Sequence, residues 1–106
     1  MDHNYDKPEP TRDEVNAWSG PAILEFGAGW CPHCQAAQPV IESVLATHPE
    51  VKHVKVGDGK GKPLGRSFQV KLWPTFIFLK DGSEAARAVR PTTPAELQDG
   101  IAAITT

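Results

Sequence analysis

The chain has 106 residues, enough for one domain, and 40% of them are hydrophobic, so a buried core can form without disulfide staples. Its formal charge of −2 gives no large basic field of the kind that nonspecific nucleic-acid binding needs. The apolar runs are short, so no segment is predicted to cross a membrane. The first eight residues, MDHNYDKP, lack the basic and apolar regions of a secretory signal, and we expect a cytoplasmic protein.

The sequence contains two cysteines, Cys31 and Cys34, separated by two residues. A permanent structural disulfide is not expected in a reducing compartment. A bridge that closes so short a loop would also restrict the unfolded chain very little. The pair therefore indicates chemistry rather than a structural crosslink.

In chain order, residues 1–10 are polar and contain two prolines, which predicts an irregular or loosely docked arm. Thr11 and Glu14 have the spacing of a capping box, which predicts a short helix ending near Trp18. Residues 22–28 form a mostly apolar run of strand length, which is typical of a buried central strand.

The middle of the chain continues with a helix that Pro32 opens and that ends near residue 47, because its apolar residues recur at helical spacing. Residues 51–56 alternate apolar with polar side chains and predict a second strand. A loop over 57–63 and a short helix over 64–68 follow.

The last part of the chain begins with a predicted strand over residues 73–79, followed by an Asp-Gly hairpin turn at 80–83. A weaker, edge-like strand is predicted over 83–90. Thr93 and Glu96 form a second capping-box pattern and predict a final helix. The apolar face of that helix consists of Leu97, Ile101 and Ile104.

This order of helices and strands predicts an α/β protein with a mixed sheet and helices on both faces. Alternating strands and helices imply parallel crossovers, and the hairpin adds an antiparallel pair. No repeat or linker interrupts the chain, so we interpret residues 1–106 as a single domain.

The Cys-Pro-His-Cys motif follows a predicted strand and opens a helix. At this place the unpaired N–H groups and the helix dipole favour the thiolate of Cys31. Cys34 lies one turn away, close enough to form a disulfide. Cys31 would attack a substrate disulfide, and Cys34 would then resolve the mixed disulfide.

The sequence resembles the thioredoxin family from about residue 11 to residue 104. The resemblance rests on the stretch LEFGAGWC-x-x-C at 24–34, Pro39, WPTF at 73–76, Gly82 and Leu97. It implies the thioredoxin fold, with a sheet of four to five strands, and the activity of a protein disulfide oxidoreductase.

The resemblance also implies roles for individual residues. Cys31 would be the exposed nucleophile and Cys34 the buried resolving thiol, with Pro74 as a cis proline packed against them. The backbone of Trp73 would pair with an extended substrate peptide. The residues expected to contact substrate are Trp30, Trp73, Thr75 and Arg90.

Glu25 aligns with the buried acid of thioredoxins, which is usually an aspartate. It would accept the proton of Cys34 during the resolving step, and burial should raise its pKa toward the working range. Lys55 lies near the place where many thioredoxins have a lysine paired with this acid.

Three departures from the family pattern suggest an altered centre. Pro32 and His33 are the pair typical of the strongly oxidising DsbA proteins, and an imidazolium beside Cys31 would stabilise its thiolate. We expect a potential between about −270 mV for thioredoxin and about −120 mV for DsbA. Trp73 before the proline, and Arg90 near a family glycine, suggest a narrower set of substrates.

Two other classes of function remain open on the sequence. The cysteines, with His33 as a third ligand, could hold a metal or an iron–sulfur group, although tetrahedral zinc needs four ligands that converge. The chain could also be a non-catalytic binding module. The presence of Glu25 and Pro74 beside both cysteines favours the enzyme.

The remaining expectations concern partners and histidines. We expect a monomer that exchanges disulfides with proteins, needs no cofactor or metal, binds neither nucleic acid nor membrane, and is recycled by a thioredoxin reductase or glutathione. The direction of the exchange, as reductase, oxidase or isomerase, is left open. His3, His48 and His53 are interpreted as solvated surface residues, and Trp18 as core packing beneath the first helix.

Overall fold

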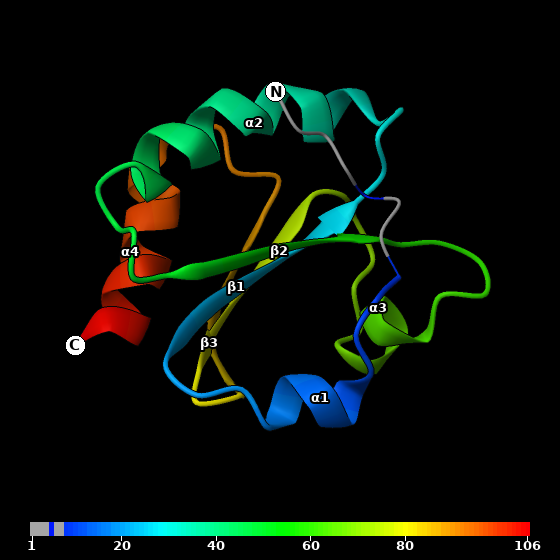
Figure 1. Ribbon diagram of the computed structural model, residues 1–106. Helices are drawn as coiled ribbons and strands as arrows, with labels where there is room; N and C mark the ends of the chain where they lie inside the picture. Colours follow the sequence, from blue (N-terminus) through cyan, green and yellow to red (C-terminus); the bar gives the residue numbers. More distant parts are fainter. Residues whose placement is uncertain (1–4, 6–7) are drawn as a thin grey trace.

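The computed structural model describes Tyr5 and residues 8–106, and it arranges them as a four-stranded sheet with helices on both sides (Figure 1). The elements in chain order are α1 (Arg12–Asn16), β1 (Pro21–Gly27), α2 (Pro32–Leu45), β2 (Lys52–Gly57), α3 (Pro63–Ser67), β3 (Thr75–Lys80), β4 (Ser83–Val89) and α4 (Pro94–Thr105).

The strands lie in the order β2-β1-β3-β4. β1 runs parallel to β2 and antiparallel to β3, and β4 pairs antiparallel with β3. The parallel pair needs a long crossover, which α2 supplies, whereas Asp81 and Gly82 make the tight turn between β3 and β4. The predicted mixed α/β sheet is therefore confirmed, with four strands.

The two faces of the sheet bury two separate apolar cores, because successive residues of a strand point to opposite faces. In β1, Ile23 packs in the core beneath α2 and α4, while Leu24 packs in the core beneath α1 and α3. Figure 1 shows α2 and α4 on one side of the strands and α1 and α3 on the other. By this alternation Glu25 belongs to the α2 face.

Of the two predicted capping boxes, one is present and the other is not. The capping box of Thr11 and Glu14 is present in both directions. The second expected box is wrong: Thr93 makes no side-chain bond to the helix backbone, because its hydroxyl lies 3.3 Å from the Glu96 carboxylate instead. Pro94 still opens α4, since its missing N–H costs nothing in the first turn.

The described residues of the N-terminal arm, Tyr5 and 8–10, are irregular, as predicted, and two of them are held against the domain. Tyr5 is buried against the cysteines, and the Glu9 carboxylate accepts a 3.0 Å hydrogen bond from the backbone N–H of Leu64. Residues 1–4 and 6–7, and with them His3, lie outside the described part of the chain.

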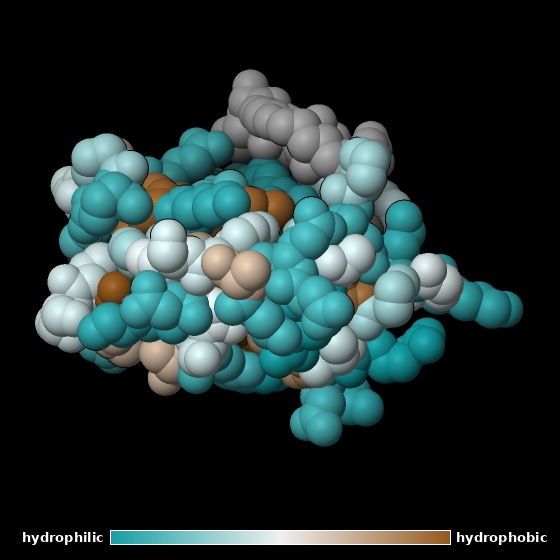
Figure 2. Space-filling view, turned by 60° about the horizontal axis from the view of Figure 1, so that its bottom comes forward, coloured by the Kyte–Doolittle hydropathy of each residue, from teal (hydrophilic) through white to brown (hydrophobic). Residues whose placement is uncertain are grey.

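The surface of the α1 and α3 side is mostly hydrophilic, with hydrophobic residues in small separate areas (Figure 2). Within the residues that the structure describes, every helix is too short or too polar to cross a lipid bilayer.

Candidate active site

Cys31 and Cys34 lie at the N-terminal end of α2, directly after the loop that follows β1, as the sequence predicted. Cys31 is the N-cap residue of the helix, and its Sγ accepts a hydrogen bond from the Cys34 backbone N–H at 3.3 Å. Pro32 occupies the first helical position. Both cysteines are free thiols, so the structure describes the reduced dithiol.

Both sulfur-bearing residues are buried, which corrects one expectation. Cys34 is 1% exposed, as a resolving thiol should be, but Cys31 is only 4% exposed rather than an open nucleophile. The reason is that Cys31 turns its sulfur toward the helix and packs in a cluster with Tyr5, Ala28 and the half-buried Trp73. A substrate must therefore reach Cys31 past the side chains at the edge of the site, which are described below and called the rim.

The peptide bond between Trp73 and Pro74 is cis, and Pro74 is buried, as the sequence resemblance implied. Thr75 does not fit its expected role in contacting substrate through its side chain. It is buried, and its hydroxyl donates to the Leu72 carbonyl at 2.6 Å. This hydrogen bond spans the cis peptide bond between Trp73 and Pro74 and ties together the two ends of that turn.

Two tryptophans form the rim. Trp30 is 73% exposed and meets Trp73 edge-on, with 5.7 Å between the ring centroids. The indole of Trp73 donates to the Asp58 carboxylate at 2.8 Å, which fixes its orientation. An aromatic pair beside a thiol, with Trp30 exposed and Trp73 half-buried, offers a stacking surface for a peptide.

Arg90 closes the other side of the rim. Its φ of 50° lies in the left-handed region that favours glycine. Its backbone N–H donates to the Pro74 carbonyl at 2.9 Å and its Nε to the Trp73 carbonyl at 2.8 Å. With His33 it lines a groove of about 160 Å³ beside the motif, together with Ala36, Val40, Pro91 and Thr92.

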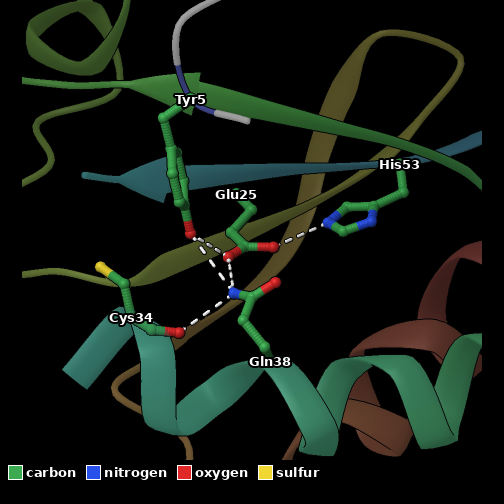
Figure 3. A network of polar contacts seen from close by, with 5 residues as sticks. All are labelled: Tyr5, Glu25, Cys34, Gln38 and His53. Atoms are coloured by element: carbon green, nitrogen blue, oxygen red, sulfur yellow. Dashed lines mark hydrogen bonds and ion pairs between the residues drawn. The ribbon is translucent and has the colours of Figure 1, made fainter. Parts of the chain in front are cut away.

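The carboxylate of Glu25 lies on the inner side of the cysteines and is fully buried. Figure 3 shows side chains converging on it from the arm, from α2 and from β2. Its Oε2 accepts hydrogen bonds from the Tyr5 hydroxyl and from Nε2 of Gln38, the latter at 2.7 Å. Its Oε1 lies 2.8 Å from Nε2 of His53.

These partners reverse the expected ionisation of Glu25. Burial raises its pKa, but the hydrogen bonds from His53, Tyr5 and Gln38 and the charge of His53 together hold the pKa below its usual range. The prediction of a raised pKa is therefore wrong, because the sequence revealed the burial and not the donors.

The ionised carboxylate acts on its neighbours. Burial, the hydrogen bond with Cys31, and the negative charges of Cys31 and Glu25 raise the pKa of Cys34 to about 12. Burial and the charge of Glu25 also raise the pKa of Tyr5. Cys34 therefore keeps its proton until a base removes it.

Comparison with known proteins agrees with this geometry. The sequence model of the family named Thioredoxin matches residues 5–103. The chain belongs to the thioredoxin family.

Thioredoxins from distant organisms align over most of their length. Thioredoxin Asp f 29 of Aspergillus fumigatus is 32% identical and aligns over 90% of this chain and 91% of its own. The solved structure of reduced thioredoxin 2 from Pseudomonas aeruginosa PAO1 is 55% identical, with a TM-score of 0.83 over 93% of this chain and 92% of that one. Thioredoxin NaTrxh from Nicotiana alata is 27% identical, with a TM-score of 0.75 over 90% and 82%. These relatives support the activity of a thiol–disulfide oxidoreductase.

In this member of the family, the partner of the buried acid differs from the expected one. Lys55 lies opposite Glu25 in the β1–β2 register, and its ammonium lies 5.2 Å from the centroid of the Tyr5 ring. His53, two residues earlier on the same face, makes the short contact with Glu25. The interpretation of His53 as a solvated surface residue is therefore wrong, whereas His48 does lie near the surface, beside Glu50.

Three residues of the centre were not predicted from the sequence: Tyr5, Gln38 and His53. Gln38 follows Cys34 by four positions, which places both on one face of α2, and its amide donates to the Cys34 carbonyl at 3.0 Å. The alternation in β2 could have placed His53 on the face of Glu25. No pattern in the sequence indicated Tyr5.

Two glycines at the ends of paired strands make room for Tyr5. A Cβ on Gly27 would lie 2.6 Å from Cys34 Sγ and 3.3 Å from the Tyr5 hydroxyl. A Cβ on Gly57, its partner in the β1–β2 register, would lie 2.5 Å from the Tyr5 carbonyl oxygen. Any larger residue at either position would displace the arm or the thiol.

Across the described ranges, residue 5 and residues 8–106, no three His, Cys, Asp or Glu side chains gather as a metal site. The arrangement that the described residues present is a thiol at a helix N-terminus, a second thiol one turn further along, and a buried carboxylate joined to the Cys34 carbonyl through Gln38.

Proposed function

We propose that this thioredoxin exchanges its Cys31–Cys34 dithiol with disulfides of protein substrates. One observation carries the proposal: the dithiol at the start of α2 has an aromatic rim suited to a peptide on its outer side, and on its inner side a buried carboxylate joined to the Cys34 backbone through Gln38. A module that only bound partners would need the rim but not the buried carboxylate beside Cys34.

The first step uses the outer side of the site. The Cys31 thiolate attacks one sulfur of the substrate disulfide, so that a Cys31–substrate disulfide forms and the other substrate sulfur leaves as a thiolate. The N-terminal end of α2 stabilises the Cys31 thiolate, because its unpaired N–H groups carry partial positive charge.

The second step uses the inner side. Cys34 gives its proton to Glu25 and attacks the sulfur of Cys31, which forms the Cys31–Cys34 disulfide and releases the second substrate thiolate. The substrate gains two electrons, and the dithiol loses them. The raised pKa of Cys34 makes a nearby base necessary for this step.

We also propose that this centre is more oxidising than that of an ordinary thioredoxin. His33 lies in the first turn of α2, two residues from Cys31, and its side chain is exposed. An imidazolium there stabilises the Cys31 thiolate and hence the reduced form, which raises the potential.

The remaining parts of the proposal concern binding and recycling. Trp30, Trp73 and Arg90 form the substrate rim of a monomer that works through its redox-active disulfide without a cofactor. Thioredoxin reductase or glutathione reduces the Cys31–Cys34 disulfide back to the dithiol. Since both are reducing systems of the cell interior, we propose the cytoplasm as the compartment.

The test is an insulin-reduction assay with dithiothreitol, combined with a redox titration in glutathione buffers. We expect turnover well above the uncatalysed rate, loss of that turnover in Cys31→Ser, and a potential above about −270 mV. Insulin reduction at the background rate would overturn the proposed activity on proteins. A potential at or below that of ordinary thioredoxin would overturn the role of His33.

A further inference from the structure

The buried carboxylate of Glu25 has one partner that reaches solvent. Tyr5 and Gln38, which bind Oε2, are both buried. The His53 side chain, which binds Oε1, is 22% exposed. His53 is therefore the partner of Glu25 whose ring reaches both the buried carboxylate and the solvent.

The geometry fixes where the proton of His53 lies. Glu25 is ionised and can only accept, so Nε2 carries a hydrogen and donates it to Oε1. Nδ1 makes no hydrogen bond to the part of the chain that is described, which leaves it for water. Protonation at Nδ1 then converts the hydrogen bond between a neutral imidazole and the carboxylate into an ion pair without moving either side chain.

We propose that His53 is a positioning residue that sets the pH dependence of the resolving step by gaining and losing charge against Glu25. This inference rests on the proposed function, because it assigns a control to the base of that reaction. When His53 is charged, the Glu25 carboxylate is stabilised and accepts the proton of Cys34 poorly. When His53 is neutral, the same buried carboxylate is a stronger base and resolution is faster.

The sign follows from the contacts. His53 lies 2.8 Å from Glu25, whereas the groups that hold Cys34 are Gln38, Cys31 and Ala28. A positive charge on His53 therefore stabilises the Glu25 carboxylate more than it stabilises the Cys34 thiolate, and it disfavours transfer of the proton between them.

The other charged or titratable groups described around Glu25 would not produce the same pH dependence of the resolving step. The ammonium of Lys55 on β2 lies over the Tyr5 ring, and burial and the charge of Glu25 keep Tyr5 on the arm protonated in the range in which a histidine titrates. Phe76 on β3, opposite Glu25 in the register, carries no charge. Cys31 and Cys34 on the α2 side are the reacting thiols themselves.

The experiment separates the two thiols by stopped-flow absorbance with dithiobis(nitrobenzoate), a small disulfide that releases a yellow thiolate. The reduced protein releases one thiolate when Cys31 attacks and a second when Cys34 resolves the mixed disulfide. The rates of the two phases are followed between about pH 5.5 and 8.5 in wild type, His53→Gln, His53→Lys and the matched control His48→Gln.

We expect the two variants at position 53 to shift the second phase in opposite directions. His53→Gln keeps a donor to Glu25 but never gains charge, so its second phase should be about three- to tenfold faster than wild type near pH 5.5 and similar near pH 8.5, since one pKa unit corresponds to tenfold. His53→Lys should be slower near pH 8.5. The first phase, and both phases of His48→Gln, should match wild type.

The proposal is overturned if His53→Gln retains the wild-type pH profile of the second phase, or if both variants slow it at every pH. If a variant does not fold, the ring of His53 in wild type can be titrated by NMR, and its midpoint must coincide with the midpoint of the second phase. If only this inference fails, insulin reduction by the wild-type protein still stays well above background. If the proposed function fails, insulin reduction falls to the background rate.

Discussion

The two cysteines face different surroundings, although they are separated by a single helical turn. Cys31 borders a rim of exposed aromatic and cationic side chains, among them Trp30 and Arg90. Cys34 borders a closed set of polar groups around Glu25. The difference separates recognition of the substrate, on the outer side, from control of the proton, on the inner side. It also implies that changes on each side should affect different steps.

The largest effect is expected from replacing each cysteine in turn. Cys31→Ser removes the attacking thiol, so insulin reduction should fall to the rate measured without protein. Cys34→Ser should still attack a disulfide but leave the product bound to Cys31, which non-reducing electrophoresis and mass spectrometry detect. If Cys31→Ser formed the mixed disulfide and Cys34→Ser did not, the assignment of outer and inner thiols would be reversed.

The next effect concerns the base on the inner side. Glu25→Gln keeps the size of the side chain but removes its ability to take a proton, so the resolving step should slow by roughly a hundredfold. Attack by Cys31 should be almost unchanged. Stopped-flow measurement of both phases checks this, and Glu25→Asp serves as the control that retains a carboxylate. Equal slowing of both phases would mean that Glu25 only supports the structure.

A smaller effect is expected from the hydroxyl of Tyr5. Tyr5→Phe removes one donor from the buried carboxylate and should reduce the free energy of unfolding by about 1 to 3 kcal/mol, measured with urea. Tyr5→Ala, which also removes the ring from the cysteine cluster, should cost more. Equal stability of Tyr5→Phe and wild type would show that water replaces the hydroxyl.

The same experiment has a pH dependence with a defined sign. The pKa of Glu25 is lowered in the folded protein, so its ionisation stabilises the fold above the ordinary pKa of about 4.3. That contribution is lost as the pH falls through the lowered pKa. The stability of wild type should therefore fall on acidification below this range more steeply than that of Glu25→Gln.

The smallest effect is expected on the outer side. Arg90→Gln removes a positive charge beside the groove, so kcat/KM should fall a few-fold for a peptide disulfide with glutamate next to the cysteine and rise for one with lysine there. The difference should shrink at high salt. Arg87→Gln is the matched control, because its guanidinium is already bound to Glu84 and to the Phe68 carbonyl. A uniform change for both peptides would contradict a role in charge selection.

The positions of the cysteines and of the cis proline could be predicted from the sequence, because they depend on short motifs and on their spacing along the chain. The motif after an apolar strand placed Cys31 at the start of α2, and the spacing to Trp73 and Pro74 carried the family pattern. The burial of Cys31 was not predictable, since it depends on how Trp73 and Tyr5 pack around it.

The inner side was only half predictable. Glu25 stood out as a charge within an apolar strand, but its donors come from three distant segments. Alternation places His53 and Lys55 on the same face of β2, and only the three-dimensional packing decides which of them contacts Glu25. Tyr5 precedes the first regular element, where no periodicity exists, and so the sign of the pKa shift was missed.

The paired glycines at the ends of β1 and β2 give the arm a further meaning. Because Gly27 and Gly57 carry no side chains, they leave a socket next to the thiol of Cys34, and the buried Tyr5 fills it. A deletion that removes Tyr5, or a fusion that pulls it away, would open the socket to water. Tyr5 therefore belongs to the packing that separates the redox centre from water, and replacing it would change the chemistry of a thiol that lies 29 positions further along the chain.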